Sequence, residues 1–244
     1  MPYPLNLAVL GTAGSGKTTL THAFGRWMKR RGMKVAFLNL DPGCERLPFR
    51  PSFDLRRYFT LSGLMKEYGL GPNGAMVKAS SLLERRAKGF AEEIRKVKAE
   101  VRLLDTPGQL EVFLFHGGRK LLSLLDGTSL SLFLFDASLI GDPAGLTLAR
   151  LLNLSVQLRL GVPTLCVVNK VDLLEGGWEG LEEGLPKLEG MPGVEAELAG
   201  RLVTLLREFL PPSRVVGVSA KRGEGMERLY DLVHEVFCAC GDLT

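Results

Sequence analysis

Cysteine and histidine are scarce in this chain. The 244 residues include 4 cysteines and 3 histidines. The cysteines at positions 44, 166, 238 and 240 are typical of a reducing compartment, and Cys238-Ala239-Cys240 is too tight and too isolated for a structural zinc site. The histidines have no metal-ligand spacing, and only His116 lies close to the segment that we expect to be catalytic. The sequence therefore predicts neither a disulfide framework nor a zinc site.

Long apolar runs and strong charge of one sign are also missing. Asp126 and Asp136 interrupt the best candidate for a membrane span, and the apolar run before Lys17 is too short for a signal peptide. The net charge of +4 is mild. We interpret the one crowded basic segment as a solvated helix face rather than a nucleic-acid surface; it contains Arg85, Arg86, Lys88, Arg95, Lys96 and Lys98. We expect a cytoplasmic protein that binds neither membranes nor nucleic acid directly.

The most informative segment is Gly11-Thr12-Ala13-Gly14-Ser15-Gly16-Lys17-Thr18, which has the G-x-x-x-x-G-K-[ST] pattern of a phosphate-binding P-loop. Its glycines let the backbone N–H groups wrap an anion at the N-terminus of the helix that follows. Lys17 supplies a charge for the outer phosphates, and Thr18 supplies a hydroxyl to Mg²⁺. The pattern predicts nucleotide binding by Gly14, Ser15, Gly16, Lys17, Thr18 and Thr19.

Six apolar runs alternate with segments of helical periodicity. This alternation predicts an α/β fold, a three-layer sandwich with a mostly parallel central sheet and helices on both faces. The predicted strands are residues 5–10, 34–40, 101–104, 129–135, 163–168 and 214–218. In such sheets ligands bind at the carboxyl ends of the strands, so the polar residues after each run are the candidates for chemistry.

The residues after three of these runs predict the ligand. Asp105 at a strand end is the expected carboxylate for magnesium, either as a direct ligand or through a bound water, and Thr106-Pro107-Gly108 would place an N–H at the γ-phosphate. Asn169-Lys170-Val171-Asp172 is a guanine signature, because the Asp172 carboxylate can accept from N1–H and the 2-amino group of guanine, and adenine has no amine there. We expect Ser219, Ala220 and Lys221 to complete the base site. GTP is favoured over ATP, since a polar pocket rejects the wrong base by leaving its groups unpaired.

The composition indicates one globular domain, with 45% hydrophobic and 24% charged residues. We assign residues 1–244 to a single P-loop GTPase domain with two insertions. The chain between Lys17 and Asp105 is longer than one helix, one strand and one loop require, which places the first insertion at about 42–99. The second, at about 175–210, is acidic and rich in glycine, typical of a surface excursion.

Together these motifs resemble those of the P-loop GTPases over nearly the whole chain. The first insertion narrows the resemblance to the GPN-loop GTPases of the SIMIBI class. Four segments carry it: Asn39-Leu40-Asp41-Pro42, Pro48-Phe49-Arg50-Pro51 with Asp54-Leu55-Arg56, Leu70-Gly71-Pro72-Asn73-Gly74, and Asp105-Thr106-Pro107-Gly108-Gln109-Leu110-Glu111. Gly-Pro-Asn alone indicates only a turn, and it becomes specific in this setting.

The resemblance implies a homodimer in which Gly71, Pro72 and Asn73 of each subunit reach the partner's nucleotide, with the Asn73 amide near the γ-phosphate. It implies that Asp41 lies near the magnesium and the attacking water, and that Gln109 and Glu111 help to order the site. The implied catalytic set is therefore Lys17, Asp41, Gly71, Pro72, Asn73, Asp105, Gln109 and Glu111, with Thr18, Asp41 and Asp105 at the metal. In eukaryotic relatives the resemblance points to RNA-polymerase assembly, so the client is a further protein that no residue here identifies.

Three other functions stay open. The first is a GTP-dependent binding switch with negligible intrinsic hydrolysis, motivated by the lack of an obvious cationic finger. The second is a metal-insertion GTPase of the nickel-delivery type, which the absence of a His-rich or paired-Cys site disfavours. The third is a P-loop kinase, which the guanine signature at 169–172 disfavours.

Overall fold

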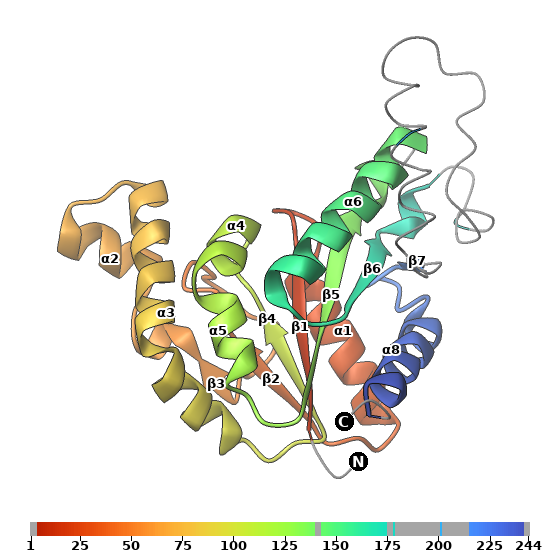
Figure 1. Ribbon diagram of the computed structural model, residues 1–244, viewed down its shortest axis with the longest axis horizontal. Helices are drawn as coiled ribbons and strands as arrows, with labels where there is room; N and C mark the ends of the chain where they lie inside the picture. Colours follow the sequence, from red (N-terminus) through yellow and green to blue (C-terminus); the bar gives the residue numbers. More distant parts are fainter. Residues whose placement is uncertain (1–3, 140–142, 175–177, 179–200, 202–214, 242–244) are drawn as a thin grey trace.

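A computed structural model describes residues 4–139, 143–174, 178, 201 and 215–241. Its centre is a seven-stranded sheet in the order β3-β2-β4-β1-β5-β6-β7, and the paired strands run parallel (Figure 1). The strands are β1 (Leu5–Gly11), β2 (Val35–Asn39), β3 (Phe53–Asp54), β4 (Val101–Asp105), β5 (Thr128–Asp136), β6 (Thr164–Asn169) and β7 (Val215–Val218). All six predicted strands are present, which confirms the α/β fold with a parallel sheet.

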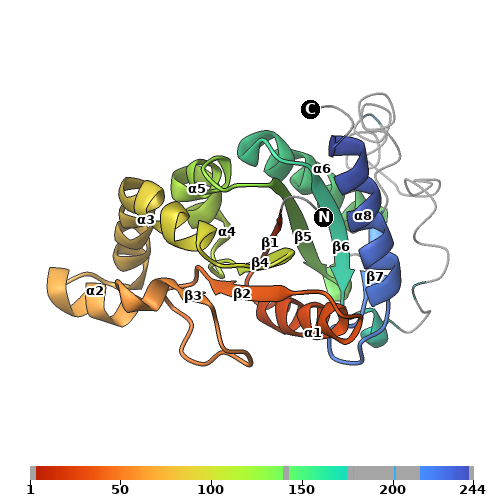
Figure 2. The same cartoon turned by 90° about the horizontal axis from the view of Figure 1, so that it is seen from below.

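Helices cover both faces of this sheet (Figure 2). On one face α1 (Lys17–Arg30) and α8 (Met226–Gly241) pack against the strands through an apolar cluster that contains Phe24 and Leu229. On the other face α3 (Pro72–Arg95), α5 (Gly118–Ser123) and α6 (Pro143–Leu160) form a second cluster around Phe90 and Phe113. With apolar layers on both sides, the central strands are buried throughout, as expected of a parallel sheet. The predicted three-layer arrangement is confirmed.

The segment between β2 and β4, where we placed the first insertion, contains β3, the short 3-10 helix η1 (Leu55–Arg57), α2 (Leu61–Tyr68) and α3. The strand β3 was not predicted, because it has only two residues and follows Pro51 closely; it pairs with Leu38 and Asn39 of β2. The α2–α3 corner lies at one side of the molecule (Figure 1). The second insertion, at about 175–210, lies outside the described residues apart from Trp178 and Arg201.

Irregular helix follows β4. The chain passes from α4 (Leu110–Val112) into a π-helix, η2 (Phe113–Gly117), and then into α5. A Cβ at Gly117 would lie 2.7 Å from Leu83 Cγ, so glycine permits the close contact between η2 and α3. His116, which we singled out from the sequence, is exposed on η2. Among the helices of the described chain, none has the length and apolar character that crossing a membrane requires.

Candidate nucleotide-binding site

The phosphate loop lies between β1 and α1. Gly14 and Gly16 have φ values of 79° and 90°, a backbone conformation that favours glycine. Gly16 has a second constraint, because a Cβ there would lie 2.3 Å from the amide nitrogen of Asn169. The first turn of α1 contains no acidic residue. Its N–H groups and helix dipole are therefore available to a phosphate.

Lys17 is held within this loop. Its Nζ donates hydrogen bonds to the main-chain carbonyls of Gly11 at 3.0 Å and Thr12 at 2.8 Å. Burial lowers the pKa of Lys17, and the charges of Asp105 and Asp41 oppose that effect. The ammonium group is thus already placed beside the loop, with a carboxylate pair close by.

Two acidic side chains, Asp105 at the end of β4 and Asp41 in the loop after β2, lie near this lysine. The Thr18 hydroxyl donates to Asp105 Oδ2 at 2.7 Å, and the Gly43 N–H donates to Asp41 Oδ1 at 2.8 Å. Burial, with a contribution from the charge of Asp41, raises the pKa of Asp105 to about 6, although the hydrogen bond from Thr18 and the charge of Lys17 oppose the shift. Burial also raises the pKa of Asp41, although the N–H groups of Gly43 and Gly108 lower it in part.

These oxygens fit a magnesium ion. Asp105 Oδ1 is buried and has no hydrogen-bond partner among the described residues. A divalent cation would supply that missing partner and favour the ionised form of both carboxylates. One hydroxyl and one or two carboxylates, completed by phosphate and water, are the usual protein environment of Mg²⁺. Asp105 thus lies beside Thr18 and within electrostatic range of Asp41, and the binding of magnesium by these three residues stays a prediction.

A separate pocket of about 260 Å³ lies between the loops that follow β6 and β7. Asn169, Lys170 and Asp172 line it on one side, and Ala220 and Lys221 line it on the other. Asp172 begins to ionise below the usual pH, because the Ser219 hydroxyl, followed by Arg222 and Lys221, lowers its pKa. An ionised carboxylate at this wall can accept two hydrogen bonds from a base that presents two adjacent N–H donors.

Lys170 and Asn169 fix the shape of this pocket. Lys170 has a φ of 67°, and its Nζ lies 2.5 Å from Asp136 Oδ2 at the end of β5. Asn169 Nδ2 donates to the Ser15 carbonyl at 2.8 Å, and its Oδ1 accepts from the Ala220 N–H at 3.1 Å. Asn169 therefore contacts both the phosphate loop and the base loop. No role was predicted for Asp136, although its position at a strand end could have suggested one.

The GPN motif begins α3. Gly71 is the N-cap and Pro72 the first helical residue, and both are exposed together with Asn73. The motif is thus the first turn of a helix rather than a free turn. No described contact joins it to the phosphate loop of its own chain. Gln109 and Glu111 are exposed at the start of α4, and the structure brings neither into contact with Lys17 or Thr18.

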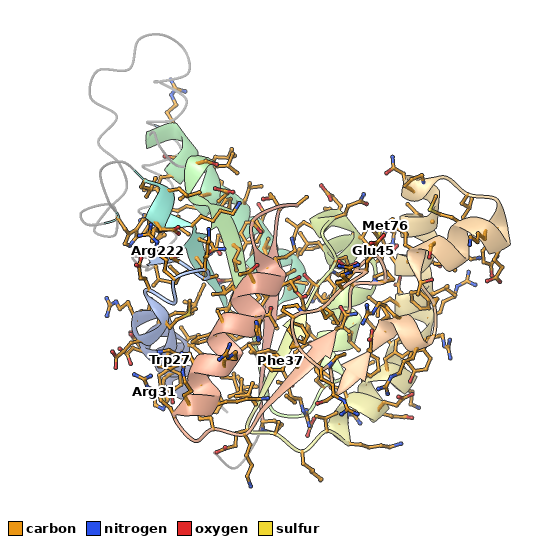
Figure 3. The ribbon with its side chains drawn as sticks, turned by 180° about the vertical axis from the view of Figure 1, so that it is seen from behind. Trp27, Arg31, Phe37, Glu45, Met76 and Arg222 are labelled. Carbon is orange, nitrogen blue, oxygen red and sulfur yellow. The ribbon has the colours of Figure 1, made fainter. Side chains whose placement is uncertain are left out.

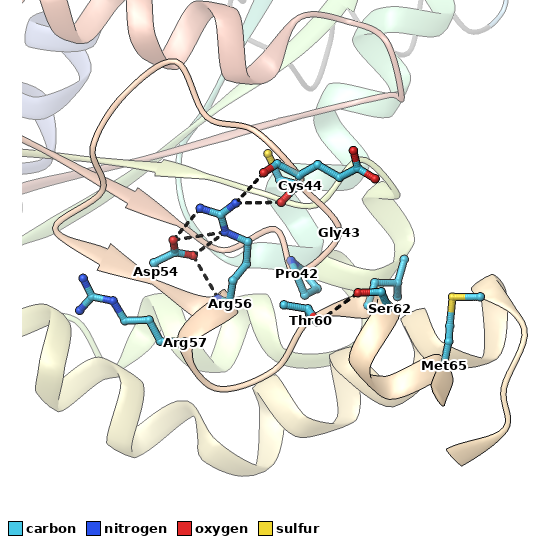
Figure 4. A pocket seen from close by; sticks show the side chains of 11 residues that line it. Pro42, Gly43, Cys44, Asp54, Arg56, Arg57, Thr60, Ser62 and Met65 are labelled. Atoms are coloured by element: carbon cyan, nitrogen blue, oxygen red, sulfur yellow. Dashed lines mark hydrogen bonds and ion pairs between the residues drawn. The ribbon is translucent and has the colours of Figure 1, made fainter. Parts of the chain in front are cut away.

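Arg56 supports the loop that follows Asp41 (Figure 4). Its Nη2 lies 2.7 Å from Asp54 Oδ2, and its Nη1 donates to the Cys44 carbonyl at 2.9 Å and the Glu45 carbonyl at 3.2 Å. Asn39 Nδ2 donates to the other Asp54 oxygen at 2.9 Å. Cys44, Glu45, Asp54 and Arg56 line a pocket of about 720 Å³. No role was predicted for Asp54 and Arg56, because only the fold shows that Arg56 reaches residues 44 and 45 while Asp54 holds its guanidinium.

The phosphate loop and the base pocket open at the carboxyl ends of the same sheet, and Asn169 connects them. This arrangement suits a nucleotide whose phosphates meet α1 and whose base meets Asp172. The fold and the site together define a P-loop nucleotide-binding protein.

Comparison with known proteins gives the family. The profile of a family described as "Conserved hypothetical ATP binding protein" matches residues 9–239. GPN-loop GTPase PAB0955 of Pyrococcus abyssi is 39% identical over 246 residues, which cover 96% of this chain and 98% of the relative. GPN-loop GTPase 1 of Dictyostelium discoideum is 28% identical over 240 residues, which cover 94% of this chain but 61% of the relative. The chain belongs to the GPN-loop GTPase family, so the resemblance found in the sequence is confirmed.

A solved structure agrees with this assignment. The crystal structure of PAB0955, a GTPase in apo form from Pyrococcus abyssi, superposes with a TM-score of 0.88 at 36% identity. The match covers 97% of this chain and 98% of that one. The fold of the archaeal relative is therefore shared over almost the whole chain.

Proposed function

We propose that this chain acts as a homodimeric GTPase that hydrolyses GTP to GDP and phosphate with Mg²⁺, and that the GPN loop of the partner subunit completes each site. One observation carries the proposal. The phosphate loop, the carboxylate pair and the base pocket lie together in one subunit, whereas Gly71, Pro72 and Asn73 are exposed and make no described contact with that subunit's phosphate loop.

Guanine is the base that fits Asp172. Its N1–H and 2-amino group form a pair of donors for one carboxylate, and adenine presents an acceptor at the corresponding position. Asp172 is ionised at neutral pH, as an aspartate with a lowered pKa must be, so an adenine would leave a charge without its partners. This chemistry favours GTP, although the family profile carries the description of an ATP-binding protein.

Hydrolysis needs a positioned water and compensation of the charge on the transferred phosphoryl group. Lys17 would exchange its bonds to the Gly11 and Thr12 carbonyls for bonds to the outer phosphates. Thr18, Asp105 and Asp41 would hold Mg²⁺, which when bound neutralises charge on the phosphate oxygens. Asp41 would also face the attacking water, with Gln109 and Glu111 ordering the segment that surrounds it.

The start of α3 suits a phosphate contact in trans. Its first turn contains no acidic residue, and its exposed N–H groups carry the positive end of the helix dipole. The Asn73 amide could donate to a γ-phosphate oxygen but brings no formal charge. Modest turnover is therefore expected, with most of the electrostatic stabilisation coming from Lys17 and the metal.

The cellular role that we propose is timing the assembly of a protein complex in the cytoplasm. The client would be a further protein, and its link to RNA polymerase comes from the family resemblance. The second candidate is a GTP-dependent switch with negligible hydrolysis of its own, which the lack of a cationic finger favours. The dependence of the hydrolysis rate on protein concentration separates the two, because only the dimeric enzyme speeds up through a dimerisation range.

A mixing experiment tests the trans arrangement. Lys17→Ala removes the phosphate contact of its own site, and Asn73→Ala removes the loop that serves the partner. In single-turnover hydrolysis, Lys17→Ala alone should be nearly inactive and Asn73→Ala alone should be clearly slower than the wild type. An equimolar mixture, checked by light scattering to be dimeric, should recover about a quarter of the wild-type activity, because half of the dimers would contain one complete site. An activity no greater than the mean of the two separate variants would overturn the proposal.

A further inference from the structure

A second hollow, of about 400 Å³, adjoins the base pocket between α1 and the loop that follows β7. Thr19, Ala220 and Lys221 line both spaces. Any nucleotide that fills the base pocket would therefore lie directly beside this hollow. The residues that line it come from elements far apart in the sequence but adjacent on one face of the sheet.

The lining of this hollow is strongly cationic. Arg26 and Arg30 lie on α1, and Lys221 and Arg222 lie on the opposing loop; no described lining residue is acidic. Figure 3 shows this side of the molecule, with Arg222 at the loop before α8 and Trp27 farther along α1. We refer to the space as the cationic hollow.

Few of these charges are neutralised within the described chain. Arg222 lies 3.7 Å from Asp172 and 3.9 Å from Glu224, which are long ion-pair distances. Arg26 and Arg30 are exposed and form no ion pair with a described residue. Arg31, just outside the hollow, differs from them, because it pairs with Glu227 at 3.1 Å and stacks on Trp27. The cationic hollow therefore presents donors that an anionic ligand could use.

The position of the cationic hollow indicates which anionic ligand could bind there. With the base at Asp172 and the 5′-phosphates at the phosphate loop, the ribose has to lie near Gly16 and Thr19, which line the base pocket. The 2′- and 3′-hydroxyls are the ribose positions that neither the base nor the 5′-phosphates occupy. A phosphate attached there would pass Thr19 into the cationic hollow, where arginine forks match phosphate oxygens.

We propose that the cationic hollow binds the 3′-phosphate groups of guanosine nucleotides that are phosphorylated at both the 5′ and the 3′ positions. This inference rests on the guanine nucleotide binding proposed above and adds a regulatory ligand for the same site. A nucleotide of this kind would occupy the base pocket and the phosphate loop together with the hollow. It would compete with GTP and hold the protein in a state that cannot hydrolyse it.

The test compares the affinities of GDP and guanosine 5′-diphosphate 3′-diphosphate for the full chain with Mg²⁺ by calorimetry. Charge-assisted hydrogen bonds to two or more cations should make the 3′-phosphorylated nucleotide bind about tenfold more tightly, or better. The double variant Arg26→Ala/Arg30→Ala should lose this preference to within about twofold and keep its GDP affinity. The matched control is Arg85→Ala, which removes an exposed arginine of α3 remote from the hollow and should keep the preference.

Each outcome separates the two proposals. If GDP itself fails to bind the wild-type chain, the proposed function is wrong. If GDP binds and the 3′-phosphorylated nucleotide binds no more tightly, the cationic hollow has a different role and the inference is overturned. It is also overturned if a short single-stranded RNA, rather than this nucleotide, loses affinity in the double variant. The milder Arg26→Gln variant should reduce the preference severalfold, which keeps the test valid if the double variant folds poorly.

Discussion

The side-chain amide of Asn169 donates a hydrogen bond to the main-chain carbonyl of Ser15 at 2.8 Å, and this bond fastens the phosphate loop to the end of β6. The same side chain accepts from the Ala220 N–H at 3.1 Å. All three residues are buried. Asn169 therefore sets the distance between the phosphate site and the base pocket without itself needing to contact the nucleotide.

Replacing Asn169 with alanine should damage both stability and binding. The Ser15 carbonyl and the Ala220 N–H would be left without this partner in the protein interior, at a cost of about 2 kcal/mol or more in the free energy of unfolding. We expect GDP affinity to fall at least about tenfold. Urea unfolding and calorimetry measure the two effects. The control Asn73→Ala removes an exposed amide and should leave both values unchanged; a stable Asn169→Ala protein with normal GDP affinity would show that Asn169 does not connect the two pockets.

Asp172 should decide which base is bound. Asp172→Asn replaces an acceptor with a group that can donate, so guanine would lose its paired acceptor and its affinity should fall by at least about a hundredfold. Xanthine nucleotides, which carry an oxygen where guanine carries its 2-amino group, should gain affinity. Competition binding with GDP and xanthosine diphosphate measures this change in base preference. Asp231→Asn, an exposed position on α8, is the control that should change neither affinity.

The sequence predicted the long strands and the nucleotide-binding motifs of this protein better than the side-chain contacts that hold the site together. Parallel strands are buried on both faces, so each produces an apolar run, and the phosphate and base motifs follow those runs at fixed spacing. The strand β3 was not predicted, because two residues are too few to show the alternation of a strand. The roles of Arg56 and Asp136 were not predicted for another reason: their contacts with residues 44, 45 and 170 form only when the chain folds.

The GPN motif shows a different limit of prediction from a single sequence. Its residues read as a turn, and the structure makes them the first turn of α3, because Pro72 is compatible with the first helical position and Gly71 adopts an extended conformation before it. Whether Asn73 meets a phosphate depends on a second subunit. No pattern within one chain can fix that relationship, and so the resemblance alone suggested it.

Asp105 should make the nucleotide-free protein less stable as the pH rises. Its pKa is raised to about 6 in the folded chain from an ordinary value of 3.8. The folded state therefore binds more protons between these values, so the stability that this group contributes is full below about pH 4 and is lost as the pH rises through about 6. Asp105→Asn should remove this loss and increase the free energy of unfolding at pH 7.5 by about 2 to 3 kcal/mol, while abolishing hydrolysis.

Urea unfolding at pH 5 and pH 7.5, with EDTA and without nucleotide, measures the change. Asp41, whose pKa is also raised, should leave part of the pH slope in the variant. Asp126→Asn provides a control of opposite sign, because the hydrogen bond from Arg102 lowers the pKa of Asp126 despite partial burial. That variant should be less stable at neutral pH. If Asp105→Asn were destabilised in the same way, Asp105 would be a structural acceptor rather than a carboxylate whose charge is disfavoured by burial.

Arg56 should act on hydrolysis through the loop that follows Asp41. Its guanidinium contacts Asp54 with one edge and the Cys44 and Glu45 carbonyls with a third nitrogen. A lysine ammonium cannot span these acceptors, so Arg56→Lys should release residues 44 and 45 and loosen the Gly43 N–H that holds the Asp41 carboxylate. We expect the hydrolysis rate constant to fall by about five- to fiftyfold with GDP affinity within twofold, because the base pocket is untouched. Arg57→Lys changes the exposed neighbour and should be silent in both measurements. Equal losses of rate and GDP affinity in Arg56→Lys would instead mean that Arg56 supports the whole nucleotide site, and the specific link between Arg56 and Asp41 would have to be abandoned.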